Sequence, residues 1–434
     1  AVVTGLFMIL TTINGYSQTT LSLKETESKL RSNNIELNIQ KKDIQKSEYG
    51  VKEAQSIYLP SLNLSGNYNR NIRPQVFFLP ATFFDPTADS KEFRSVNASA
   101  KNVYQTNLTL SVPLLQFENK PILENAQLNK ENAYLALKTL ENQKLAELRK
   151  IYFDALWAKA QHDFWIENLK RQSRILSDVR QRLEQGFLTE ADTLQAYVQV
   201  ENLKPNLIKA KNAYTLAENQ LKLLLNLPSQ ESLQFSDSLY FNPKNIVFSN
   251  FETKKRTDLE QLNIQKKILD NQAKIEKAKL MPNLQLVGQH SILTQHENFK
   301  FNEYRWVNST FVGLQLNVPL FNGFRQNNKM AQIKLESEQT SERYNFAVKQ
   351  INLEIQTLQN TLQETSLQLQ TQEKVLKAAQ RSYNLMYDRW KKGIVKQGDL
   401  IDSEMVLQQA KLNHIGLIYN CLLVELELKK AQGE

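Results

Sequence analysis

Two long stretches without proline constrain the fold of this chain more than any other feature of its sequence. No proline occurs in residues 122–186 or in residues 320–393, and the whole chain of 434 residues contains only 11 prolines and 12 glycines. At about 1.5 Å per residue, a helix through either stretch would extend on the order of 100 Å. A compact globular domain has no room for such a helix, so long uninterrupted elements are expected.

An apolar stripe with a spacing of seven residues runs along both stretches. A sustained spacing of this kind is typical of coiled coils. The residues beside the stripe stay polar, as in 356–372, so these helices are expected to be only partly buried. A ring of helices around water, packed through apolar seams, would satisfy the pattern. The stripe consists of Val348, Ile355, Leu362, Leu369, Leu376, Tyr383 and Trp390, and its counterparts in the first stretch are Leu148, Ala155, His162, Leu169, Leu176 and Leu183.

The sequence contains an internal duplication. Residues 59–66, LPSLNLSG, are echoed by residues 281–288, MPNLQLVG, and residues 108–114, LTLSVPL, recur as residues 314–320, LQLNVPL. Matched landmarks in the same order indicate two copies of one unit, which reads as helix, strand, loop, strand, long helix, glycine turn and returning helix. Three further landmarks keep their spacing in both copies, namely Arg182, Gly186 and Asp192 in the first and Arg389, Gly393 and Asp399 in the second.

The duplication divides the chain into five segments. Residues 1–18 carry an apolar run followed by small and polar residues, which is typical of the remnant of a secretory signal peptide. That run is too short to cross a bilayer as a helix, and no other stretch approaches the roughly 20 apolar residues required, so any membrane crossing must use strands. We assign the first copy to residues 19–227, a connector to 228–251, the second copy to 252–428 and a C-terminal tail to 429–434.

Each copy contains a pair of runs in which apolar and polar residues alternate. These runs predict strands at about 59–70 and 104–113 in the first copy and at about 281–292 and 308–319 in the second. The alternation gives each strand one apolar and one polar face, and the runs approach the roughly 9–11 residues of a tilted membrane strand. The loop at 71–102, rich in Pro and Phe, fits an outer-membrane barrel. An ordinary loop capping a small sheet fits the strands equally well, and the long helices favour the membrane interpretation.

Shorter helices are expected before the strands and after the glycine turns. The first group lies at about 21–57 and 258–280, and the returning helices lie at about 192–227 and 399–428. Pro205 should kink or interrupt the first returning helix, because proline lacks the amide donor that a helix interior requires.

Composition and spacing argue against an enzyme. The formal net charge of +9 comes from basic residues spread along the helices, without a basic stripe interleaved with aromatics, so no nucleic-acid partner is expected. The single cysteine, Cys421, lies in an apolar helical run and is interpreted as a buried small hydrophobe. The four histidines lack metal-ligand spacing, and no nucleophile with a base or phosphate loop can be identified. We therefore expect no catalytic residue, no metal and no cofactor.

Short motifs occur in a fixed order through the chain. They are NNIEL at 33–37, the strand starts at Pro60 and Pro282, the strand exits at Pro113 and Pro319, LLNLP at 224–228, and GIVKQGDLI at 393–401. By their order and duplication, the motifs resemble those of the TolC family of outer-membrane efflux proteins. The resemblance covers the whole chain after the signal remnant.

The resemblance implies a mainly α fold with a membrane β-barrel. It implies a homotrimer in which a coiled-coil α-helical barrel is continuous with a shared outer-membrane β-barrel, and each protomer gives four strands. The location would be the outer membrane of a Gram-negative bacterium, in contact with its lipid and extending into the periplasm. A periplasmic adaptor (membrane fusion) protein and an inner-membrane pump would complete the conduit.

The expected function is a passive outer-membrane exit duct of an efflux or secretion system. Energy would come from the pump, since the chain shows no nucleotide site. The alternative is a periplasmic coiled-coil scaffold without a pore, or an adaptor protein. A scaffold would not conduct ions, whereas a channel would be a detergent-extracted trimer that conducts in a planar bilayer.

The two glycine turns are the first candidate site. Gly186 and Gly393 permit the tight reversal between helices, and the resemblance implies that such tips contact the adaptor. The docking candidates are the turn glycines and the residues flanking them: Arg182, Gly186, Leu188, Arg389, Gly393 and Val395.

Acidic residues after the turns are the second candidate site. Asp399 and Asp402 lie three apart on one helix face and resemble the aperture acids of the family, where rings of acids favour cations. The alternative is that Asp399 only caps or charges a helix N-terminus. Asp192 and Glu190 occupy the corresponding place in the first copy, which lacks the second spaced Asp.

Overall fold

The computed structural model describes residues 19–73, 75–243 and 256–433. The predicted signal remnant lies outside the described residues, as does part of the connector. The chain forms two compact units. Among the described residues, one unit comprises 19–43, 133–243, 256–263 and 342–433, and the other comprises 44–73, 75–132 and 264–341.

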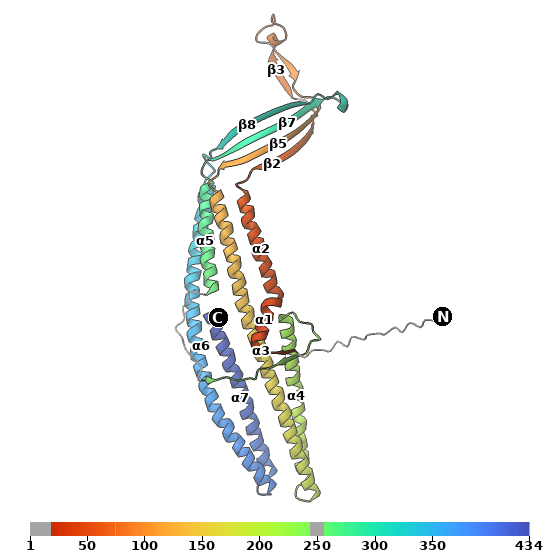
Figure 1. Ribbon diagram of the computed structural model, residues 1–434, viewed down its shortest axis with the longest axis vertical. Coiled ribbons are helices and arrows are strands. Elements are labelled where there is room, and N and C mark those ends of the chain that lie inside the picture. The colour runs from red at the N-terminus through yellow and green to blue at the C-terminus, as the bar shows by residue number, and fades with distance from the viewer. Residues whose placement is uncertain (1–18, 74, 244–255, 434) are drawn as a thin grey trace, which may run out of the picture. The chain divides into compact units, whose positions relative to one another are not determined.

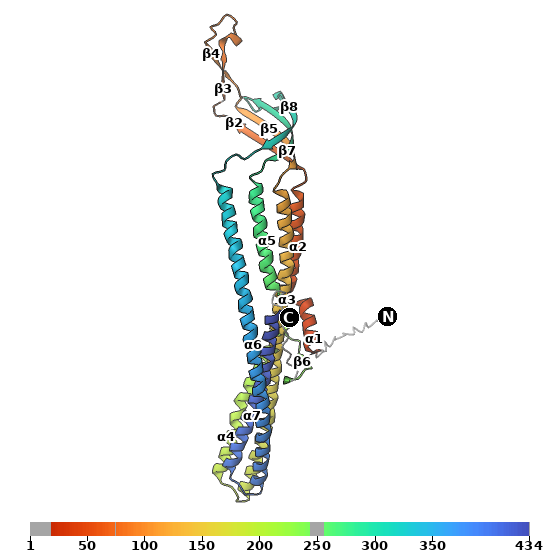
Figure 2. The same cartoon turned by 90° about the vertical axis from the view of Figure 1, so that its left-hand side faces the viewer.

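Helices account for most of the described chain, and the two longest fall on the proline-free stretches. Helix α3 has 66 residues and α6 has 67. Helix α4 returns along α3, and α7 returns along α6 (Figures 1 and 2). The helices are α1 (Leu23–Asn33), α2 (Ile35–Ser56), α3 (Asn119–Glu184), α4 (Glu190–Leu224), α5 (Thr257–Ala278), α6 (Arg325–Lys391) and α7 (Gln397–Gln432).

The seven-residue stripe is the buried side of the long helices, which confirms the coiled-coil prediction. Leu362, Leu369, Tyr383 and Trp390 of α6 are buried, and so are Leu148, Ala155 and Leu176 of α3. Cys421 of α7 is buried beside Leu362 and Leu369. Burial raises the pKa of the Cys421 thiol, so this cysteine is the inert small hydrophobe that the sequence predicts.

The prediction of a single helix at 21–57 is wrong, because the structure has two helices that are separated at Asn34. The Asn34 side chain accepts a hydrogen bond from the amide of Leu37 at 3.0 Å and so caps the start of α2. Its Nδ2 donates to the carbonyl of Leu224 at 2.9 Å. The two bonds place Asn34 where α2 begins and α4 ends.

Part of the predicted connector belongs to the helical unit rather than linking the copies loosely. Strand β6 (Leu233–Phe235) pairs in parallel with β1 (Thr19–Leu21). Leu233 and Phe235 are buried, and the Phe235 ring meets the Tyr152 ring edge-on at 5.3 Å. This segment is therefore held by its apolar side chains.

The returning helices show neither an interruption at Pro205 nor a tail at 429–432. Helix α4 continues through Pro205 without interruption, and buried Val200, Leu203 and Ala210 hold it on both sides of the proline. Helix α7 continues to Gln432, so residues 429–432 are not a tail. The reason is that Ala431 is buried and its carbonyl accepts a hydrogen bond from Arg256 Nη1 at 2.6 Å.

The second unit contains a four-stranded antiparallel sheet in the order β2-β5-β7-β8. Each copy of the duplication contributes two neighbouring strands, and β5 and β7 join the copies. Strands β2 and β8 form the two edges. The bounds are β2 (Ser61–Arg70), β5 (Asn102–Leu115), β7 (Asn283–His296) and β8 (Val307–Asn317).

The two faces of this sheet differ in chemistry. On one face Asn107 Oδ1 accepts hydrogen bonds from Gln105 Nε2 at 3.0 Å, Ser291 Oγ at 2.7 Å and Gln289 Nε2 at 3.3 Å. The opposite face carries six leucines and one valine that are exposed to the surroundings. They are Leu62, Leu64, Leu108, Leu110, Val312, Leu314 and Leu316.

The loop expected at 71–102 has structure of its own. It contains the antiparallel hairpin of β3 (Val76–Pro80) and β4 (Phe93–Asn97). Phe77, Phe78 and Phe93 on this hairpin are exposed. Among the described residues, no helix is both long enough and apolar enough to cross a membrane.

Candidate functional site at the helix tips

The two glycine turns have the same backbone geometry. Gly186 has φ of 80° and Gly393 has φ of 72°, both in the left-handed region that glycine favours. In the first turn the amide of Gly186 donates to the carbonyl of Leu183, and that of Phe187 donates to Arg182. The second turn repeats these two bonds at the equivalent positions. This is the Schellman arrangement that ends a helix on a glycine.

The acidic residues after the turns cap the returning helices. The backbone amide of Thr189 donates to Asp192 Oδ2 at 2.9 Å, and the Asp192 amide donates back to Thr189 Oγ1. At α7 the Lys396 amide donates to Asp399 Oδ2 at 3.1 Å. The helix-capping role that the sequence left open is therefore present at both aspartates. Glu190, Asp399 and Asp402 are nevertheless exposed.

Arg182 joins the tips of the two hairpins. Its Nη1 donates to the carbonyl of Trp390 at 2.8 Å and its Nη2 donates to that of Lys391 at 2.5 Å. The guanidinium also lies 4.2 Å from the centroid of the Trp390 ring. A cation beside the last carbonyls at a helix C-terminus is favourable, because those carbonyls carry partial negative charge. Arg182 is thus engaged within the chain, although the sequence suggested it for docking.

Gln397 makes a second bond between the tips. Its Nε2 donates to the carbonyl of Asp192 at 2.7 Å, and the side chain is buried. This contact joins the start of α7 to the start of α4. Together, Arg182 and Gln397 hold the two turns side by side.

Two neighbouring apolar residues at each tip differ in their exposure. Leu188 and Val395 pack against the buried cluster that contains Val179 and Trp390. The residues that directly follow the turn glycines point outward instead, since Phe187 is 76% exposed and Ile394 is 66% exposed.

Phe187 and Ile394 occupy equivalent positions in the two copies and were missed in the sequence. The available signal was an apolar residue immediately after a left-handed glycine, where a solvent-exposed turn usually carries a polar one. The exposed apolar residues of the tips are therefore Phe187 and Ile394, each one position before the predicted Leu188 and Val395.

A buried ion pair joins α3 to α7 above the tips. Arg171 Nε lies 2.8 Å from Glu404 Oε1, and Arg171 Nη2 donates to Asn168 Oδ1 at 3.0 Å. Glu404 and Asn168 are both buried. Burial, with the charge of Glu404, raises the pKa of the nearby Tyr383 hydroxyl. Removing one partner of such a pair costs about 3–5 kcal/mol, because an unpaired charge remains buried.

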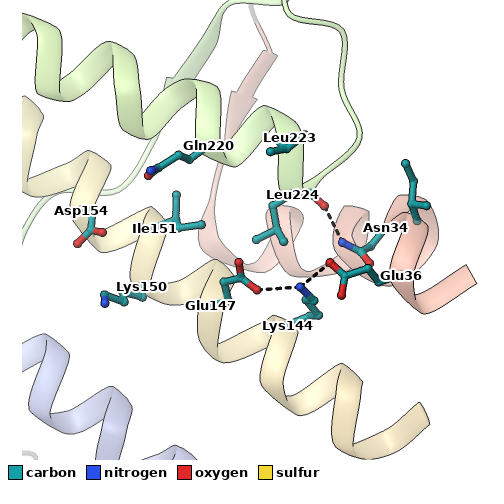
Figure 3. A pocket seen from close by; sticks show the side chains of 11 residues that line it. Asn34, Glu36, Lys144, Glu147, Lys150, Ile151, Asp154, Gln220, Leu223 and Leu224 are labelled. Carbon is teal, nitrogen blue, oxygen red and sulfur yellow. Dashed lines mark hydrogen bonds and ion pairs between the residues drawn. The ribbon is translucent and has the colours of Figure 1, made fainter. Parts of the chain in front are cut away.

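A cleft of about 650 Å³ lies elsewhere in the helical unit, between α2, α3 and α4. Lys144 Nζ lies 2.7 Å from Glu36 Oε1 and 3.0 Å from Glu147 Oε2 (Figure 3). These charges pair with one another and present no nucleophile with a base. In the part of the chain that the structure describes, no group of three His, Cys, Asp or Glu residues could hold a metal ion.

The profile of the outer membrane efflux protein family matches residues 27–227 and 252–434, which together make up most of the chain. The chain belongs to this family. It is a non-enzymatic efflux channel of the outer membrane that extends into the periplasm. The predictions of family, fold class, location and absence of enzyme activity are confirmed. Membership of the family also implies a tripartite efflux assembly.

Individual relatives share the fold at low sequence identity. The outer membrane protein TolC of Vibrio cholerae is 20% identical over 391 residues, which cover 88% of this chain and 84% of that protein. The structure of CusC matches with a TM-score of 0.74 at 17% identity, covering 98% of this chain and 95% of CusC. The open state of the Neisseria gonorrhoeae MtrE channel matches with a TM-score of 0.73 at 17% identity, covering 95% and 88%.

Proposed function

We propose that the chain is one protomer of a homotrimeric, passive exit duct that receives its substrates from a periplasmic adaptor and an inner-membrane pump. The observation that carries the proposal is the four-stranded sheet. Its two edges are unpaired within the described residues, one face is polar, and the other exposes apolar side chains. In water, open edges and an exposed apolar face would favour aggregation.

Closure with sister copies satisfies both features of the sheet. The outer strands of four antiparallel strands run in opposite directions, so β8 of one copy can pair antiparallel with β2 of the next. Any number of such copies gives the even strand count of a bacterial membrane barrel. The apolar face then meets outer-membrane lipid, and the polar face around Asn107 lines the water-filled interior.

The helix tips are the proposed docking surface for the adaptor. Phe187 and Ile394 present exposed apolar side chains there. Gly186 and Gly393 shape the turns, and Leu188 and Val395 support them from the buried side. Exposed aromatic and aliphatic residues at a rigid turn are suitable anchors for a partner.

Asp399 and Asp402 are the proposed aperture acids, with Asp192 and Glu190 in a supporting role. In a trimer each would recur as a ring, and acidic rings favour cations. The capping bond of Asp399 is compatible with this role, because its side chain stays exposed while one oxygen accepts from Lys396.

Planar-bilayer recording of the detergent-extracted protein tests the proposed duct. We expect a trimer by native mass spectrometry and stepwise ion conductance on insertion. The rival scaffold would extract without detergent and would give no conductance. A stable trimer that never conducts would contradict the proposal.

The same recording tests the aperture with the double variant Asp399→Asn, Asp402→Asn. Asparagine keeps an acceptor for the Lys396 amide but removes the negative charge. We expect a weaker preference for cations, measured as a smaller reversal potential in a salt gradient, and a higher conductance. Unchanged selectivity would reduce both residues to a structural role.

A further inference from the structure

The inference concerns Arg389, the counterpart of Arg182 in the second copy. Arg182 donates to the last carbonyls of α6, those of Trp390 and Lys391. The equivalent carbonyls in the first copy belong to Leu183 and Glu184 at the end of α3. Among the described residues, the exposed guanidinium of Arg389 makes no hydrogen bond and no ion pair.

The carbonyl oxygen of Leu183, at the end of α3, can accept one more hydrogen bond. The carbonyl of Trp390 accepts from the Gly393 amide at 2.9 Å and also from Arg182. The carbonyl of Leu183 accepts from the Gly186 amide at the same distance. Since a carbonyl oxygen has two lone pairs, Leu183 can take a second bond as Trp390 does.

The second observation is a difference in exposure between equivalent residues of the two copies. Glu404 on α7 is 2% exposed and pairs with Arg171 of α3, whereas the equivalent Tyr197 on α4 is 45% exposed. Asn168 on α3 is fully buried, whereas the equivalent Val375 on α6 is 44% exposed. The first copy thus covers the second within one chain, whereas among the described residues Val375 on α6 and Tyr197 on α4 stay exposed.

We infer that Arg389 donates to the carbonyls of Leu183 and Glu184 of a neighbouring copy of this chain, which caps the C-terminus of that copy's α3. The inference rests on the proposed trimer and specifies how its tips are joined. The same contact brings Val375 of one copy against Tyr197 of the next, so two exposed apolar side chains bury each other. Ala378, the counterpart of Arg171, lies three residues after Val375, so the ion pair to Glu404 is replaced at this contact by apolar side chains.

The contact between the two tips of one chain differs from the proposed contact between the tips of neighbouring copies. Glu190 stands at the position equivalent to Gln397, and its side-chain carboxylate has no hydrogen-bond donor. The bond from Gln397 to the Asp192 carbonyl therefore has no counterpart between copies. Arg389 consequently carries the polar contact between neighbouring tips.

Cysteine cross-linking tests this contact in the full chain with Cys421→Ala. The test pair is Glu184→Cys with Arg389→Cys, and the matched control is Arg182→Cys with Lys391→Cys, whose native side chain and carbonyl meet within one chain. A short bismaleimide is added to the detergent-extracted protein, and products are separated on a denaturing gel. We expect covalent dimers and trimers from the test pair, and only monomers with an internal cross-link from the control.

The oligomeric state is measured separately by native mass spectrometry of the same samples. A trimer whose test pair stays monomeric on the denaturing gel, while the control pair forms its internal cross-link, would overturn the inference and leave the trimer intact. A monomer in native mass spectrometry would contradict the trimer itself, and the inference with it.

Discussion

Lysine at Leu64 and Leu314 is expected to abolish insertion of the chain into the outer membrane. Both leucines lie on the exposed apolar face of the sheet, one on β2 and one on β8. A lysine on the lipid face of a membrane barrel costs about 2–4 kcal/mol near the bilayer midplane. Each site recurs in every copy of a trimer, so the total penalty would be several times larger. Membrane fractionation with immunoblotting measures the effect.

The neighbouring polar residues supply the matched control. Ser65 and Gln315 adjoin Leu64 and Leu314 in sequence but point to the opposite face. Lysine at these two positions should leave insertion intact, because the side chain would lie in water. Equal insertion of the apolar-face and polar-face variants would mean that the apolar face does not meet lipid.

Aspartate at Phe187 and Ile394 is expected to abolish export in cells while the purified channel still conducts. Both side chains are exposed at the tips and contribute little to packing, so the fold should tolerate the change within about 0.5 kcal/mol. A charge at the centre of an apolar docking surface would prevent its desolvation. The measurements are the loss of export dependent on the pump in cells and the conductance of the purified variant.

Leucine at the same two positions is the control for this prediction. It keeps an apolar side chain at each tip and should preserve export. Photo-cross-linking from position 187 in cells should capture a periplasmic partner, whereas the exposed polar position Gln356 on α6 should not. Normal export by the aspartate variant would place the docking surface elsewhere.

The long helices and the sheet could be predicted from the sequence because their signals are local and periodic. A spacing of seven identified Leu362, Leu369 and Trp390 as buried residues, and alternation gave the two faces of the strands. The pairing of strands within each copy followed from the duplication, and the number of four strands in each protomer followed from the resemblance; the order β2-β5-β7-β8 is known from the structure alone. Each of these signals depends only on residues close together in the chain.

The features that the sequence did not predict depend on contacts between residues far apart in the chain. Asn34 divides the first helix partly because its side chain reaches the end of α4 at Leu224. Strand β6 forms because Leu233 and Phe235 enter a core built by α1, α3 and α4. No local pattern predicts such partners.

The turns that carry the candidate site are present where the sequence predicts them, whereas their contacts were not predicted. The turn glycines adopt the left-handed backbone that the tight reversal requires. Arg182, however, binds carbonyls more than two hundred residues away, and that engagement could not be read from spacing. The exposed apolar residue of each tip directly follows the glycine, and only the side-chain directions distinguish Phe187 from Leu188.

Electron cryomicroscopy of the detergent-extracted protein tests the closure of the sheet most directly. We predict three copies in which β8 of each pairs antiparallel with β2 of the next, so that no strand edge remains open and the apolar face turns outward. A single molecule whose β2 and β8 edges stay unpaired, or whose apolar face is folded into a core of its own, would contradict the proposed duct.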